Sequence, residues 1–112
     1  MKIFVNSIHL YYEKFGEGSP LILLHGNGES HQIFDRAIPI LSRYFTVYAL
    51  DTRGHGESDM VREFHYSDMA EDVKCFIEAL ALQKPILYGF SDCGIVGLMI
   101  ASKYPDLLES IT

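Results

Sequence analysis

One segment governs the interpretation of this chain: Pro85-Ile86-Leu87-Tyr88-Gly89-Phe90-Ser91-Asp92-Cys93-Gly94. Its first half is apolar, as in a short buried strand, and the residues that follow it are apolar, as in a packed helix. A serine at a sharp turn between a strand and a helix has its hydroxyl pushed away from the backbone. The helix then directs its free N–H groups toward whatever that hydroxyl attacks. The pattern therefore predicts that Ser91 is a nucleophile.

Two further apolar runs, Leu21–Leu24 and Phe45–Leu50, precede this segment. Neither alternates as a half-exposed strand does, so we expect both to be buried on the two faces of a sheet. Helical periodicity follows each run. One helix is expected over residues 30–42, kinked or broken at Pro39, and the other is expected to start from an N-cap at Ser67.

The last predicted helix, from Asp92 to about Tyr104, is apolar nearly all round and is expected to be central. The residues expected in its core are Ile95, Val96, Leu98, Met99 and Ile100. Three successive strand–helix repeats predict a parallel sheet with helices on both faces. Ahead of them, alternating residues on both sides of Asn6-Ser7 predict an antiparallel hairpin. The predicted fold class is therefore α/β, a three-layer, mostly parallel sheet with an N-terminal antiparallel hairpin.

Glycine-containing loops follow all three predicted strands, at His25–Gly28, Asp51–Ser58 and Gly89–Gly94. Ligands bind beyond the carboxyl ends of the strands in sheets of this class. Because the carboxyl ends of parallel strands share one edge, we expect the three loops to converge on a single site.

The end of the chain, Leu107–Thr112, resembles the approach to a further strand. A sheet that ended there would have a long, apolar, unpaired edge, which promotes aggregation. We therefore expect residues 1–112 to be the N-terminal part of a single domain in a longer protein. The missing C-terminal half, or a second copy of the chain, is expected to cover the open edge.

The composition argues against several classes of partner. The net charge is -6 and the 9 Lys and Arg residues are scattered, which disfavours nucleic-acid binding. No apolar run approaches the roughly 20 residues of a membrane span, and the N-terminus is too polar for a signal peptide. Cys75 and Cys93 do not make a disulfide framework, and the spacing of the histidines, cysteines and acids does not suggest a metal site. We expect a cytoplasmic protein with no cofactor and no metal.

Three motifs occur in order: His25-Gly26-Asn27-Gly28, Asp51-x-Arg53-Gly54-x-Gly56-x-Ser58 and Gly89-x-Ser91-x-Cys93-Gly94. Together they resemble the N-terminal half of an alpha/beta-hydrolase, in the esterase, lipase and enol-lactonase-like branch. The resemblance covers essentially the whole chain and implies an incomplete alpha/beta-hydrolase fold. It implies that Ser91 is the catalytic nucleophile of a Ser–His–acid triad whose histidine and acid lie outside this chain. It also implies an oxyanion hole made by the backbone N–H groups of Asn27 and Asp92.

Several of these residues have a plainer alternative. Ser is a favoured helix cap, so the alternative for Ser91 is a capping role, and the alternative for the loop at Asn27 is a simple turn. Cys93 stands where the family usually has glycine. We expect its small side chain to pack, the alternative being a thiolate activated by the helix N-terminus. Arg53 is expected to pair with a carboxylate or carbonyls, the alternative being substrate binding. His25 is expected to organise its own turn.

The resemblance thus implies a serine hydrolase that acts through an acyl-enzyme on the carbonyl of an ester, lactone, thioester or amide, with a small molecule as substrate. Serine at position 91 argues against epoxide-hydrolase or dehalogenase chemistry, which in this family uses a carboxylate nucleophile. We expect the 112-residue chain alone to be nearly inactive. Two alternatives are a degenerate hydrolase-fold domain that binds a small ligand or partner, and a relative with lyase or haloperoxidase chemistry.

Overall fold

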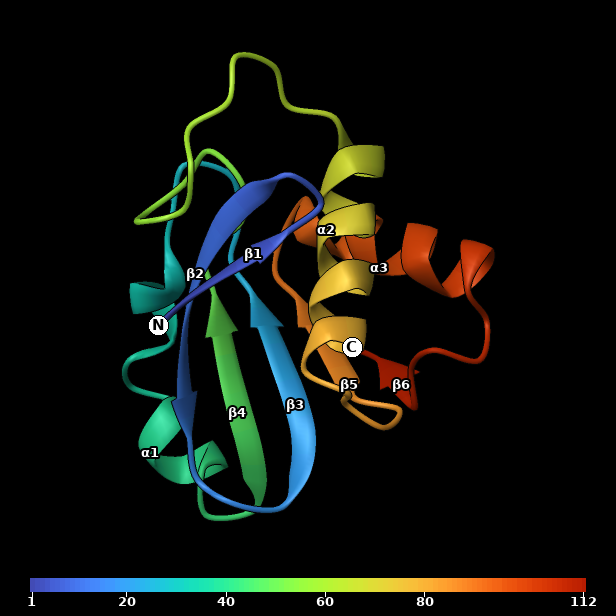
Figure 1. Ribbon diagram of the computed structural model, residues 1–112. Helices are drawn as coiled ribbons and strands as arrows, with labels where there is room; N and C mark the ends of the chain where they lie inside the picture. The colour runs from blue at the N-terminus through green and yellow to red at the C-terminus, as the bar shows by residue number, and fades with distance from the viewer.

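The computed structural model describes residues 1–112 as a mixed sheet of 6 strands with helices on both faces (Figure 1). The strands are β1 (Lys2–Val5), β2 (Ile8–Phe15), β3 (Ser19–Leu24), β4 (Phe45–Leu50), β5 (Ile86–Gly89) and β6 (Ser110–Ile111). Their order is β1-β2-β4-β3-β5-β6; β4, β3, β5 and β6 run parallel, and β2 is antiparallel to both β1 and β4. The predicted α/β class, with an antiparallel hairpin beside a parallel sheet, is confirmed.

The hairpin between β1 and β2 turns on two residues in the left-handed region. Asn6 has φ 49° and Ser7 has φ 67°, while Val5 pairs with Ile8 across the turn. A two-residue turn with positive φ at both positions matches the right-handed twist of the strands that it joins. The hairpin predicted around these two residues is therefore confirmed.

The central strands are buried on both faces. In β3, Ile22 and Leu24 lie in a cluster of 17 buried residues, whereas Leu21 and Leu23 lie in a separate cluster of 6. Successive side chains of a strand point to opposite faces, so a strand between two cores has to be apolar at every position. This explains the continuous apolar runs of the sequence.

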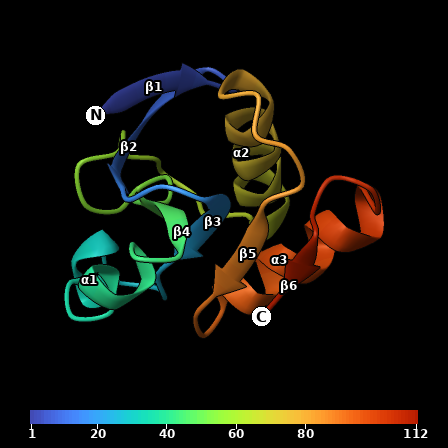
Figure 2. The same cartoon turned by 90° about the horizontal axis from the view of Figure 1, so that it is seen from below.

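Helices cover both faces of the sheet. The larger cluster includes residues of α2 (Tyr66–Ala79) and α3 (Cys93–Lys103). The smaller one includes residues of the 3-10 helix η1 (His31–Phe34) and of α1 (Ile38–Leu41). Figure 2 shows α1 and α2 on opposite sides of the sheet. No helix of the chain combines the length and the apolar character that crossing a bilayer requires.

Two helix predictions are wrong in detail. The single helix expected over residues 30–42 is divided into η1 and the single turn of α1. The interruption precedes Pro39, which lies in the first turn of α1, where its missing N–H costs no hydrogen bond. Helix α2 begins at Tyr66 after an N-cap at His65, so Ser67 lies inside the first turn and is not the cap.

Helix α3 is less central than its composition suggests. Val96 and Ile100 are fully buried, but Ile95 is 45% exposed and Leu98 is 65% exposed. The buried face of the helix packs on β5, β6 and α2, and Ile95 and Leu98 lie outside that face. The prediction that Ile95 and Leu98 belong to the core is therefore wrong, because an all-apolar helix does not reveal which of its faces is covered.

Candidate active site

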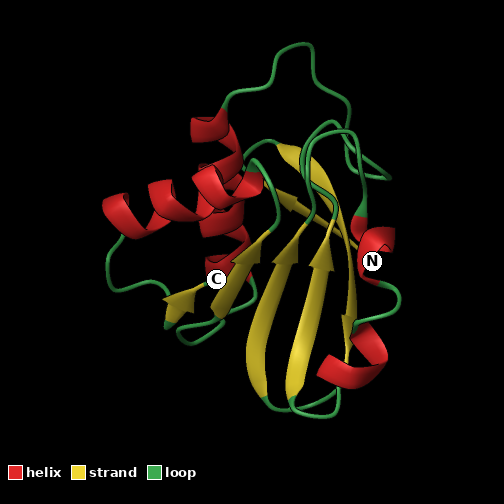
Figure 3. Ribbon diagram, turned by 180° about the vertical axis from the view of Figure 1, so that it is seen from behind, coloured by secondary structure: helices red, strands yellow, loops and turns green.

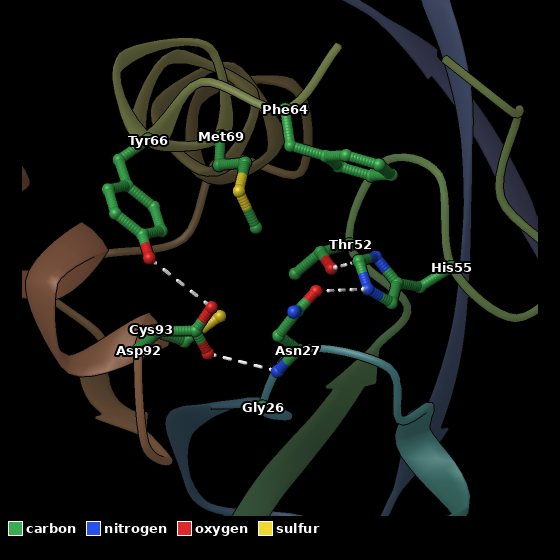
Figure 4. A pocket seen from close by; sticks show the side chains of 9 residues that line it. All are labelled: Gly26, Asn27, Thr52, His55, Phe64, Tyr66, Met69, Asp92 and Cys93. Atoms are coloured by element: carbon green, nitrogen blue, oxygen red, sulfur yellow. Dashed lines mark hydrogen bonds between the residues drawn. The ribbon is translucent and has the colours of Figure 1, made fainter. Parts of the chain in front are cut away.

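The loops that follow β3, β4 and β5 meet at the carboxyl edge of the sheet, above the tips of the strands (Figures 1 and 3). Together with residues from the start of α2 and the segment before it, they surround a pocket of about 250 Å³ (Figure 4). The lining residues are Gly26, Asn27, Thr52, His55, Phe64, Tyr66, Met69, Asp92 and Cys93. All three loops contribute to this lining, so the predicted convergence is confirmed.

Ser91 occupies the turn between β5 and α3. Its φ is 59°, its side chain is exposed, and its hydroxyl makes no hydrogen bond. The N-cap of α3 is Asp92, and no side chain caps the helix, so the alternative that Ser91 serves as a helix cap is wrong. Ser91 is not among the residues that line the pocket, but a Cβ built on Gly26, which does line it, would lie 3.2 Å from the Ser91 Cβ.

Gly89 makes this sharp turn possible. A Cβ at position 89 would lie 2.7 Å from the carbonyl carbon of Cys93 and 3.0 Å from the Gly94 nitrogen. Real side chains do not approach backbone so closely, so only glycine allows the end of β5 to pass against the start of α3. A Cβ at Gly94, by contrast, would meet only the Gly89 carbonyl oxygen at 3.7 Å, which is an ordinary contact.

A buried histidine orients the peptide between Gly26 and Asn27. Nε2 of His25 accepts from the Thr52 N–H at 3.0 Å, so Nδ1 carries the proton and donates to the Gly26 carbonyl at 2.7 Å. Burial lowers the pKa of His25 below its ordinary value of 6.5, which keeps the ring neutral. The carbonyl and N–H of a trans peptide point in opposite directions, so this bond turns the Asn27 N–H into the pocket.

Of the two backbone donors expected at this site, one already has a hydrogen-bond acceptor within the chain and the other has none. The N–H of Asp92 donates to no acceptor in the chain. The N–H of Asn27 donates to Oδ1 of Asp92 at 2.9 Å, and the other carboxylate oxygen lies 3.5 Å from the Tyr66 hydroxyl (Figure 4). One donor is therefore free, and the other holds a carboxylate of the same chain.

Cys93 follows Asp92 in the chain and lines the same pocket. Its side chain is buried, with 1% of the residue exposed. Burial, with a smaller contribution from the charge of Asp92, raises the pKa of the Cys93 thiol to about 12. The thiol therefore stays protonated at neutral pH, in agreement with the expected packing role and against the alternative of an activated thiolate.

The loop between Asp51 and Ser58 is held by its own polar residues. Asp51 is fully buried and accepts from the backbone N–H groups of His31 (2.7 Å) and Glu57 (2.9 Å). Arg53 makes a bidentate ion pair with Asp72 of α2, at 2.6 Å and 2.8 Å. The predicted pairing of Arg53 is confirmed, and this ion pair ties the loop to α2 rather than to the pocket.

The sequence interpretation missed His55 and Tyr66. His55 accepts from the Gly28 N–H at 3.0 Å through Nε2, so it braces the loop that carries Asn27. Tyr66 begins α2 and reaches the carboxylate of Asp92. His55 belongs to the second motif, but nothing in its local sequence indicates that it contacts a loop 27 residues earlier.

Comparison with known proteins gives consistent matches. Residues 19–112 match a family profile described as alpha/beta hydrolase fold. Serine hydrolase BPHL of Homo sapiens is 36% identical over 120 residues, covering 98% of this chain and 40% of that protein. Soluble epoxide hydrolase of Corynebacterium sp. (strain C12) is 34% identical over 108 residues, covering 96% of this chain and 38% of that protein. The crystal structure of E-2-(acetamidomethylene)succinate hydrolase superposes with a TM-score of 0.94 at 32% identity, over 99% of this chain and 42% of that one. The chain thus spans about two fifths of the length of these relatives.

Proposed function

Because this chain belongs to the alpha/beta hydrolase fold family, we propose that it supplies the nucleophile and the oxyanion hole of a serine hydrolase. One observation carries the proposal: Ser91 presents an exposed, unpartnered hydroxyl from a backbone held at φ 59°. Keeping a non-glycine residue in that region costs on the order of 1–3 kcal/mol, and strain of this kind is concentrated at functional sites. The turn at Ser91 is thus best explained as a nucleophile elbow.

The proposed reaction is acyl transfer. The Ser91 oxygen attacks the carbonyl carbon of an ester, lactone, thioester or amide while a histidine base takes its proton. The carbonyl oxygen becomes negatively charged, and the N–H groups of Asn27 and Asp92 stabilise it. The leaving group departs with a proton, and water then releases the acid from Ser91.

In the proposal, neither of the two histidines at the site, His25 and His55, is the general base. His25 and His55 are both engaged with the loops of the site, as tautomers whose Nε2 accepts from backbone N–H groups. In the proposal the histidine and the acid of the triad are supplied by another part of the hydrolase. In a well-studied serine protease, removal of the base costs on the order of 10⁶ in turnover. The chain by itself is therefore expected to be nearly inactive.

A fluorophosphonate probe tests the proposal, because it labels only an activated serine. A protein in which residues 1–112 are followed by the rest of the fold should be labelled at Ser91, and its Ser91→Ala variant should not. The matched control is Ser102→Ala, on the exposed surface of α3, which should be labelled as the parent is. Labelling that persists in Ser91→Ala, or robust p-nitrophenyl acetate turnover by the 112-residue chain that Ser91→Ala abolishes, would contradict the assignment.

Epoxide opening is a weaker candidate, despite the similarity to a soluble epoxide hydrolase. That chemistry in this family needs a carboxylate at the apex of the turn, and the residue there is Ser91. The carboxylate of the next residue, Asp92, accepts a hydrogen bond from the Asn27 N–H. The similarity therefore supports the shared fold rather than a shared nucleophile.

A non-enzymatic binding role is the second candidate. It is favoured by the carboxylate of Asp92, which already occupies the Asn27 N–H that a substrate oxygen would need. A domain of this kind would bind a small ligand in the pocket without forming a covalent bond to Ser91. The fluorophosphonate experiment separates the two, since labelling at Ser91 requires an activated hydroxyl.

A further inference from the structure

The Asp92 side chain lies where the proposed reaction needs an open position. Its Oδ1 is 2.9 Å from the Asn27 nitrogen, within the pocket, while the backbone N–H of the same residue has no acceptor (Figure 4). We propose that Asp92 gates the oxyanion hole: its carboxylate occupies the Asn27 N–H and turns toward Tyr66 before a substrate oxygen binds. This inference rests on the proposed function, in which the Asn27 N–H stabilises that oxygen.

The loop does not depend on Asp92 to keep its shape. The Gly26 carbonyl accepts from His25 at 2.7 Å, and the Gly26 N–H donates to Glu29 at 2.9 Å. The Gly28 N–H donates to His55 at 3.0 Å. Both sides of Asn27 are therefore fixed by other groups, so its N–H continues to point into the pocket when the carboxylate leaves.

The carboxylate itself is weakly held. Asp92 forms no ion pair with any lysine, arginine or histidine of the chain. The buried Asp72, by contrast, forms an ion pair with Arg53, with 2.6 Å between Oδ2 and Nε. Its only partners are the Asn27 N–H and, at 3.5 Å, the Tyr66 hydroxyl. A carboxylate with one good donor and a second donor close by has two available positions, and the Tyr66 hydroxyl offers the partner for the open one.

The closed position reduces the affinity of the site for a substrate oxygen. A hydrogen bond to a charged acceptor contributes enough to shift an equilibrium by about tenfold or more. A carbonyl oxygen has to displace that bond, so the gate lowers its affinity by a similar factor. Shortening of the 3.5 Å bond from the Tyr66 hydroxyl recovers part of this loss, which makes Tyr66 a positioning residue that acts through Asp92.

Acetate provides a direct probe, because its carboxylate resembles the one that occupies the site. The amide spectrum of ¹⁵N-labelled protein is followed while acetate is added to the parent, Asp92→Ala, Asp92→Asn and Asp106→Ala. Asp106 is exposed and forms no ion pair, so its variant controls for the loss of one negative charge. In Asp92→Ala we expect saturable shifts of the Asn27 and residue 92 amide signals, with an affinity about tenfold above the parent.

Asp92→Asn separates occupancy from charge. The asparagine oxygen still accepts from the Asn27 N–H, but a hydrogen bond to a neutral acceptor is only about half as strong. The gain in acetate affinity should therefore be clearly smaller in Asp92→Asn than in Asp92→Ala. Equal gains in the two variants would show that charge repulsion alone limits binding and would overturn the gate. Equal acetate affinity in the parent and Asp92→Ala would overturn it as well. Asp92→Ser, also short, replaces Asp92→Ala if the alanine variant does not fold.

The role of Tyr66 is tested in both backgrounds. Tyr66→Phe should lower acetate affinity in the parent and leave it unchanged in Asp92→Ala, because the hydroxyl acts only on the carboxylate. An equal loss in both backgrounds would contradict that role. None of these signals requires a reactive Ser91, so a failure of fluorophosphonate labelling and a failure of the gate are distinguishable.

Discussion

The strain at Ser91 makes a specific prediction about stability. Its backbone has φ 59°, and its hydroxyl has no hydrogen-bond partner. Ser91→Gly removes the Cβ that makes this conformation unfavourable. Ser91→Ala keeps the Cβ and removes only the hydroxyl. The two variants therefore separate the backbone strain from the contribution of the side chain.

The magnitude follows from two opposing effects. A non-glycine residue in the left-handed region costs about 1–2 kcal/mol. Glycine loses part of that gain, about 0.4–1 kcal/mol, because it makes the unfolded chain more flexible. We therefore expect Ser91→Gly to raise the free energy of unfolding by up to about 1.5 kcal/mol. Ser91→Ala should change it by less than about 0.5 kcal/mol, since no hydrogen bond is lost.

Urea denaturation is the assay. The midpoints are compared between variants that have the same slope of unfolding free energy against urea concentration. The matched control is Ser102→Gly, in the last turn of α3, where the serine is already helical, so that glycine should not raise the free energy of unfolding. A Ser91→Gly variant that is less stable than the parent would refute the reasoning. A loss of more than about 1 kcal/mol in Ser91→Ala would do the same, because it would reveal an interaction of the hydroxyl.

Three further predictions concern residues around the site. Cys93 should resist iodoacetamide in the native protein at pH 8, because burial raises its pKa to about 12; rapid alkylation at that position, read by mass spectrometry, would contradict this. Asp72→Ala should destabilise the fold by about 3 kcal/mol by leaving Arg53 with only the carboxylate of Asp68, 3.9 Å away, whereas the double change Arg53→Met with Asp72→Leu should be nearly neutral; a denaturation midpoint of the single variant close to the parent would refute it. His25 has a folded-state pKa below its ordinary 6.5, so its contribution to stability is present above pH 6.5 and lost as the pH falls toward the folded pKa. Imidazole ¹⁵N shifts should show His25 neutral at pH 6.5 with the proton on Nδ1, and a half-charged ring at that pH would count against the assignment.

The fold could be predicted from sequence wherever the signal was local. The continuous apolar runs of β3 and β4 identify strands covered on both faces, and the Asn6-Ser7 pair identifies the hairpin. The same patterns did not predict helix boundaries correctly where several residues could start or end a helix almost equally well. The segment over residues 30–42 divides into two short helices, and His65 rather than Ser67 precedes α2, because neighbouring contacts decide between similar local options.

The sequence by itself determined which loops form the site, because the carboxyl ends of parallel strands must lie at one edge of the sheet. It also identified Ser91 as the residue at the sharp turn. Only the tertiary structure decided that the Asp92 carboxylate lies on the Asn27 N–H, 65 residues away in the chain, and that His55 and Tyr66 adjoin it. The physical reason is one of range. Periodicity and turn chemistry act over a few residues, whereas the partner of a side chain depends on how β3, β5 and α2 pack together.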